Sequence, residues 1–241
     1  MIHKHSLSQQ KISDIVAWNY QAADVFQHYG IDFCCNGKTR LRDACHKKQV
    51  PIDKIVQQLM NLEKTYTSRL VENYHEWDPE SLVDYLKNNH HHFVKTKSGE
   101  IETYCEKVAN VYGKRHPESV SIFHAFVGLD RDLFHHLQTE ETRTFSLITK
   151  ISRLKKENRP VPADLRHQLS DELQGMESEH EHAMEIMGHI RHLSNDFTPP
   201  PEACTTYRML YQKLEEFESN LKKLVHIENN ILFQKAESLI A

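Results

Sequence analysis

Apolar residues recur at three- and four-residue intervals along most of the chain, a spacing typical of amphipathic helices. Turn signals are sparse, because the 241 residues include only 7 Gly and 8 Pro. This punctuation predicts four long helices, at residues 79–112, 117–155, 163–195 and 202–239. Four long helices with short connections predict an all-α protein built on an antiparallel four-helix bundle.

The first 60 residues follow a different pattern, with shorter helical stretches interrupted at Gly30, Gly37 and Pro51. They predict a small helical N-terminal domain, followed by a helical or extended connector. An Asp-Pro-Glu run at residues 78–80 supplies an N-cap and a proline at the first helical position, so the first long helix should begin there. The predicted parts are the N-terminal module at 1–60, the connector at 61–78 and the bundle at 79–241.

Three of the long helices carry ligand-type side chains on their apolar stripes. His136 and Glu140 share a stripe on the second helix, His180 lies on that of the third, and Glu228 on that of the fourth. The apolar residues that define these stripes are Leu129, Leu133, Leu147, Leu173, Met176, Met184, Met187, Leu214, Phe217, Leu221, Leu224 and Ile231. Burying an unpaired carboxylate is costly, so the pattern predicts a metal that compensates the charge. The alternative is that the helices are rotated differently and both acids are solvated.

Composition narrows the class of protein. Lys and Arg total 30 against 34 Asp and Glu, so no broad basic field is expected to bind nucleic acid or an anionic membrane. No stretch approaches the roughly 20 apolar residues of a membrane span, and the N-terminus lacks the apolar region of a secretory signal. We therefore expect a soluble, cytoplasmic protein. Imidazole and carboxylate ligands without thiolates suit iron, manganese or zinc, and two carboxylates that could bridge suit a pair of metals.

Five cysteines are an odd number, and without an export signal they are expected to be free thiols. Cys34 and Cys35 lie between two predicted helices with Lys38 nearby, an environment that favours the reactive thiolate. A disulfide between them is not expected, because neighbouring Cα atoms are about 3.8 Å apart whereas disulfides span about 4.4 to 6.8 Å. The alternative is that both are small residues that pack a tight module.

Several motifs together resemble the iron-sulfur cluster repair di-iron proteins, also called the repair of iron centres family, whose main domain is hemerythrin-like. They are YGIDFCCNGK, HHLQTEE, MESEHEHAM, TPPPEACTTY and HIENNILF. The resemblance implies non-haem iron, two per chain, and Glu140 and Glu228 as bridging carboxylates. The ligands that it implies are His91, His136, Glu140, His180 and Glu228. His91 is selected from the consecutive His90, His91 and His92 on resemblance alone, since helical periodicity does not decide among them.

One position departs from the family pattern. The family places a histidine four residues before the last glutamate, where this chain has Leu224. His226 lies about 200° around the helix from Glu228 and is not expected to replace it. The outcomes left open are a weaker second iron, a water or another side chain in the gap, or a mononuclear site.

The resemblance implies repair of iron-sulfur clusters damaged by nitric oxide or oxidative stress, by donation of iron, with damaged iron-sulfur proteins as clients. Cys34 and Cys35 are then candidate redox or iron-transfer thiols. Two alternatives are an enzyme that reduces nitric oxide or activates dioxygen, and a sensor that binds oxygen or nitric oxide. A metal-free helical interaction protein is a further alternative. Whether the chain turns over a substrate, and whether it forms a homodimer, stay open at this point.

Overall fold

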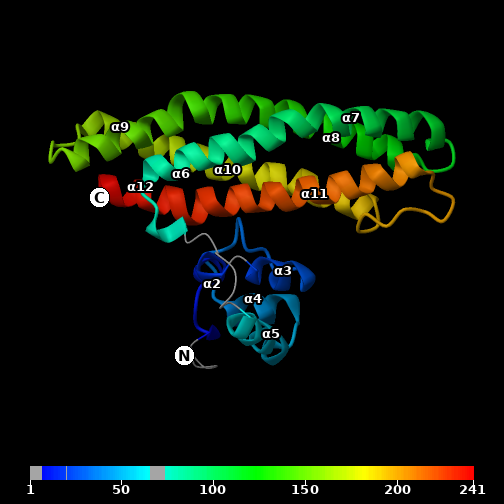
Figure 1. Ribbon diagram of the computed structural model, residues 1–241, viewed down its shortest axis with the longest axis horizontal. Coiled ribbons are helices and arrows are strands. Elements are labelled where there is room, and N and C mark those ends of the chain that lie inside the picture. The colour runs from blue at the N-terminus through cyan, green and yellow to red at the C-terminus, as the bar shows by residue number, and fades with distance from the viewer. Residues whose placement is uncertain (1–6, 20, 66–73) are drawn as a thin grey trace. The chain divides into compact units, whose positions relative to one another are not determined.

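The structure is a computed structural model that describes residues 7–19, 21–65 and 74–241 (Figure 1). In these ranges the regular elements are helices, apart from one isolated bridge between Lys11 and Arg40. The prediction of an all-α protein with a helical bundle and a small helical N-terminal region is therefore confirmed. None of the helices in the described ranges is both long enough and apolar enough to cross a membrane.

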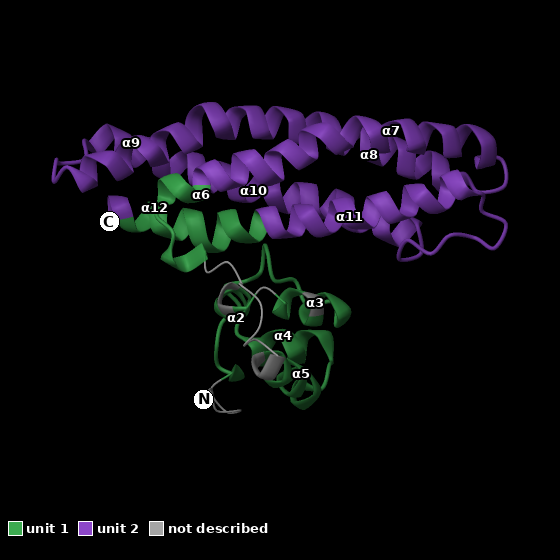
Figure 2. Ribbon diagram, in the orientation of Figure 1, with its two compact units in different colours: residues 1–82, 225–238 green, residues 83–224, 239–241 purple. Residues whose placement is uncertain are grey.

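The chain forms two compact units (Figure 2). Unit 1 combines residues 1–82 with 225–238, and unit 2 combines 83–224 with 239–241. The predicted domain limits at residues 60 and 78 stay a prediction, and residues 66–73 of the predicted connector lie outside the described ranges.

The four predicted long helices are present with ends close to the expected ones. The first consists of α6 (Pro79–Tyr85), η3 (Leu86–His91) and α7 (His92–Tyr112). The second consists of α8 (Pro117–Thr139), η4 (Glu140–Thr144) and α9 (Phe145–Lys156). The third is α10 (Ala163–Leu193), and the fourth consists of α11 (Thr205–Ile227), η5 (Glu228–Leu232) and α12 (Phe233–Ile240). Asp78 caps α6 as expected, since its Oδ1 accepts the backbone N–H of Glu80 at 3.1 Å.

Aromatic side chains and an ion pair with a buried carboxylate join the helices of unit 2. Phe217 on α11 contacts Phe126 on α8, with ring centroids 5.4 Å apart, and Phe93 on α7 at 6.3 Å. Arg191 on α10 donates to Glu218 on α11, with Nε 2.8 Å from Oε1. The four helices therefore share one core, where apolar stripes from each helix are removed from water.

Three of the long helices contain a short π-helical segment, in which backbone hydrogen bonds span five residues instead of four. Predicted ligands occur in each: His91 ends η3, Glu140 begins η4 and Glu228 begins η5. The fourth long helix, α10, is α-helical throughout and carries His180. Such π segments are rare in proteins, and those that occur are often found at functional sites. Their positions are therefore consistent with a functional role for the predicted metal ligands.

Unit 1 contains short helices at the N-terminus and the last turns of the C-terminal helix. The N-terminal elements are α2 (Ile12–Trp18), α3 (Ala22–His28), α4 (Leu41–Lys48), α5 (Ile52–Thr65) and η2 (Tyr74–Glu76). Gly30 follows α3 with φ of 63°, a left-handed conformation that favours glycine, and lets the chain turn into the loop that carries the two neighbouring cysteines.

Candidate metal centre

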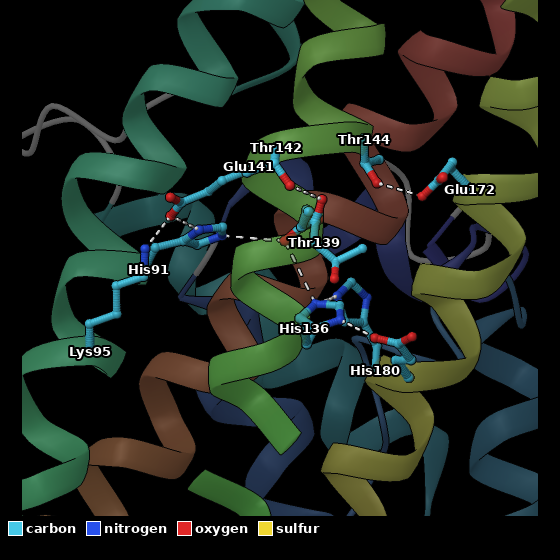
Figure 3. A network of polar contacts seen from close by, with 11 residues as sticks. His91, Lys95, His136, Thr139, Glu141, Thr142, Thr144, Glu172 and His180 are labelled. Atoms are coloured by element: carbon cyan, nitrogen blue, oxygen red, sulfur yellow. Dashed lines mark hydrogen bonds and ion pairs between the residues drawn. The ribbon is translucent and has the colours of Figure 1, made fainter. Parts of the chain in front are cut away.

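His136 on α8 and His180 on α10 face one another in the core of unit 2 (Figure 3). Their Nε2 atoms are 3.0 Å apart, and the two rings meet edge to face. Glu140 lies one turn after His136, and its Oε2 is 3.6 Å from His136 Nε2. Each of the three residues offers a ligand atom within 4.8 Å of the others, and all three side chains are buried. Helical spacing thus brings together the acid and the two imidazoles predicted from the sequence.

His91 approaches Glu140 from the first long helix. Its Nε2 lies 3.4 Å from the same Oε2 atom, and its ring stacks on Phe145 with centroids 5.3 Å apart. Of its two neighbours, His90 is buried beside Asn220, with Nδ1 3.3 Å from Oδ1, and His92 is exposed. The Glu140 carboxylate therefore lies beside imidazoles from three helices, an arrangement suited to a bridging ligand. We call His91, His136, Glu140 and His180 the bundle centre.

Two acidic residues outside this set accept hydrogen bonds from the Nδ1 atoms of the imidazole rings; Figure 3 labels one of them, Glu141, beside His91. His91 Nδ1 donates to Glu141 Oε1 at 2.8 Å, and His136 Nδ1 donates to Glu179 Oε2 at 2.7 Å. Lys95 also donates to Glu141 Oε1, at 2.7 Å. A hydrogen bond at Nδ1 fixes the tautomer that leaves Nε2 available to a metal. Neither acid was predicted from the sequence, because neither lies on an apolar stripe.

The bundle centre fits a metal ion. Glu140 is completely buried, and among the described residues neither of its carboxylate oxygens has a hydrogen-bond partner. Burial by itself would raise the pKa of Glu140, but the adjacent His91, His136 and His180 outweigh it and hold the pKa below its ordinary value. The 3.0 Å between the two Nε2 atoms matches two ligands at right angles, each about 2.1 Å from a shared metal. Nitrogen and oxygen donors of this kind suit iron, manganese or zinc.

Glu228 belongs to unit 1, where it is completely buried at the first residue of η5. Its assignment as a ligand stays a prediction. Leu224, one turn earlier on the same helix, is a buried apolar residue of unit 2. His226 is buried too, and its Nδ1 lies 3.4 Å from the Phe33 carbonyl oxygen and 3.3 Å from Asn230 Nδ2. Burial lowers the pKa of His226 to about 4, so this ring is neutral near neutral pH.

The role of the two neighbouring cysteines as redox or iron-transfer thiols stays a prediction. Cys34 is buried and Cys35 half-buried, and neither forms a disulfide. The pKa of the Cys34 thiol is raised well above its ordinary value by its hydrogen bond with Cys35, by burial and by the nearby Asp32 carboxylate. The expected helix-end stabilisation of a thiolate is therefore outweighed at Cys34, whose thiol is protonated near neutral pH.

Comparison with known proteins agrees with the motifs and the geometry. Residues 8–63 match a family model, ScdA_N, described as a domain of unknown function (DUF542). The iron-sulfur cluster repair protein ScdA of Staphylococcus haemolyticus is 27% identical over 98% of this chain and 99% of its own length. A probable iron-sulfur cluster repair protein of Haemophilus influenzae is 29% identical over 95% of this chain and 97% of its own length.

Over almost its whole length the chain is similar to iron-sulfur cluster repair proteins. A third relative, the repair protein YtfE of an Escherichia coli O81 strain, is 27% identical over 90% of this chain and 91% of its own length. The first two matches extend over 98% and 95% of this chain, so the similarity is not confined to the N-terminal module. The family resemblance inferred from the motifs is confirmed.

Proposed function

We propose that this chain is a cytoplasmic di-iron protein that repairs iron-sulfur clusters damaged by nitric oxide or oxidative stress, by donating iron to damaged client proteins. The observation that carries the proposal is the buried Glu140 carboxylate, which lies beside the imidazoles of His91, His136 and His180. The relatives that match the chain over almost its whole length are named for the same repair activity.

We assign the iron ligands to the bundle centre and Glu228, with Glu140 and Glu228 as bridging carboxylates. Support for Glu228 comes from its burial, from the π segment that it begins, and from its position one turn after Leu224 on the long helix. In this assignment Leu224 leaves one iron with one imidazole fewer. Fewer protein ligands favour release, which a donor of iron requires.

A transfer experiment tests the donation step. The iron-loaded chain is mixed without oxygen with a hydratase whose four-iron cluster has been damaged by nitric oxide. Recovered hydratase activity and iron retained per chain are then measured together. We expect activity to return as iron leaves the chain, and no recovery with Glu140→Gln, which keeps the shape of the side chain and removes its charge.

Two results would contradict donation. One is that both irons stay on the chain after prolonged incubation with the damaged client. The other is sustained consumption of nitric oxide in the presence of an electron donor without iron loss, which would favour the reductase alternative.

A further inference from the structure

The loop between α3 and α4 places two thiols and a carboxylate together in unit 1. Asp32 Oδ1 accepts the backbone N–H groups of Cys34 and Cys35 at 2.9 and 3.1 Å, and it accepts the Cys34 thiol at 3.2 Å. Asn36 Nδ2 donates to the other oxygen, Oδ2, at 2.6 Å. The carboxylate thus fixes the backbone of the cysteine pair and keeps one of its oxygens beside the Cys34 sulfur.

The spacing of these atoms matches a coordination sphere. The two Sγ atoms are 3.9 Å apart, and two thiolates bound tetrahedrally at about 2.3 Å from one metal would be separated by about 3.8 Å. A carboxylate oxygen at about 2.0 Å in the same sphere would lie about 3.5 Å from each sulfur, and the Asp32 Oδ1 to Cys34 Sγ distance is 3.2 Å. All three ligand atoms lie within 4.8 Å of one another.

We propose that Asp32, Cys34 and Cys35 form a second metal site that binds a thiophilic divalent cation, ferrous iron or zinc. The bundle centre offers only nitrogen and oxygen donors, so this site adds the softer donors that the bundle centre lacks. Three ligands from one short loop leave a coordination position open, and an open position permits exchange of the metal, whereas structural sites are closed by four protein ligands. Asp32 and Cys35 are half-buried, so a cation can enter from solvent.

The charges of the three side chains also favour a cation at this site. A carboxylate and two thiolates within a few ångströms repel one another, and a bound cation would offset that repulsion. A bound cation would displace the thiol protons, so its affinity is expected to rise with pH.

The loop is held in place by the C-terminal helix of the same unit. Asn230 Nδ2 donates to the Cys34 carbonyl oxygen at 2.8 Å. A side chain at Gly37 would place its Cβ 2.5 Å from Asn230 Oδ1 and 2.9 Å from the Phe33 carbonyl oxygen, so the close approach to backbone requires glycine there. Asn230 is two residues from Glu228 on η5, so the cysteine loop is tied to a predicted iron-binding turn. If the proposed repair function holds, the loop site is where iron cargo would rest outside the bundle centre; the site itself does not depend on that function.

Titration with cobalt(II) tests the site in the full-length protein. The bundle centre is first loaded with iron, and cobalt is added without oxygen in the presence of a phosphine reductant. We expect a thiolate-to-cobalt charge-transfer band and the visible bands of tetrahedral cobalt. These should be lost in Cys34→Ser and in Cys35→Ser, and retained in Cys204→Ser, whose thiol is exposed elsewhere on the chain.

A charge-removing variant and a displacement experiment test whether cobalt binds specifically at this loop. Asp32→Asn keeps an oxygen that accepts the loop N–H groups but removes the charge, so cobalt should bind more weakly while circular dichroism stays unchanged. Ferrous iron or zinc added afterwards should abolish the cobalt bands by displacement. Absence of the charge-transfer band at saturating cobalt, or an identical band in both Ser variants, would overturn the proposal. The band is expected even in a chain whose bundle centre fails to hold iron, which separates this test from that of the repair function.

Discussion

At the scale of single residues, the first prediction concerns the acidic partners of the imidazoles and their effect on iron binding. Glu141 accepts hydrogen bonds from His91 Nδ1 and from Lys95. Without Glu141, the His91 ring can rotate and its tautomer is no longer fixed. We expect Glu141→Ala to weaken iron binding by about 10- to 100-fold, measured by competition with a coloured chelator. Glu185→Ala, at an exposed position of α10, is the matched control. Equal affinities of the two variants would show that Glu141 does not orient a ligand.

Leu224 makes the second prediction at this scale. It is buried one turn before Glu228, where the family pattern has a histidine. Leu224→His should slow the loss of iron to a chelator, because it supplies the absent imidazole. The same substitution should slow transfer to a damaged client if the missing ligand favours release. Leu221→His, which introduces the same ring at another buried position of α11, should not retain iron better than the original chain.

These residues show how far sequence reasoning reaches. His136, Glu140 and His180 could be found because polar side chains on an apolar stripe need a partner in the core. Glu141 and Glu179 could not, since acids off the stripe resemble any solvated residue until the helices are placed. The burial of Cys34 could be given only as one of two alternatives, because it depends on how the loop folds back onto Asn230.

At the scale of elements, proline and glycine punctuation predicted the ends of the long helices to within a few residues. The π segments η3, η4 and η5 were not predicted, because one wider turn does not disturb the three- and four-residue apolar spacing on either side. Their coincidence with His91, Glu140 and Glu228 became visible only in the structure.

The ion pair between α10 and α11 makes the third prediction. Glu218 is buried and accepts from Arg191 and from Lys222, whose Nζ lies 3.0 Å from Oε2. Burial alone would raise the pKa of Glu218, but the two cations outweigh it and lower the pKa from its ordinary 4.5. A carboxylate with a lowered pKa in the folded state stabilises the protein above its unfolded-state pKa. That stability is lost as pH falls from 4.5 through the folded-state pKa.

Glu218→Gln should therefore lower the free energy of unfolding by about 2 kcal/mol near neutral pH, because the buried side chain loses its charge-assisted hydrogen bonds with the half-buried Arg191. It should also make stability less dependent on pH below 4.5. Urea unfolding of the metal-free protein measures both effects without a contribution from bound iron. Glu215→Gln, at an exposed position of the same helix, should change neither. A Glu218→Gln variant as stable as the original chain would mean that the pair contributes nothing to the packing of α10 on α11.

At the scale of the whole molecule, the fold class and the family followed from the sequence, through helical periodicity and a few specific motifs. The division into two compact units did not, because unit 1 includes residues 225–238 from the far end of the chain. Periodicity describes each helix separately, so it could not show that the C-terminal turns pack with the N-terminal module. That packing ties the cysteine loop to Asn230.

The measurement that tests the central claim most directly is the iron content of the full-length protein, purified without oxygen or added chelator, beside that of Glu140→Gln. Elemental analysis should give near two irons per chain for the original protein and little or none for the variant. This result would follow if Glu140 is the buried bridge between the imidazoles. No iron in the original protein, or the same content in both, would contradict the account.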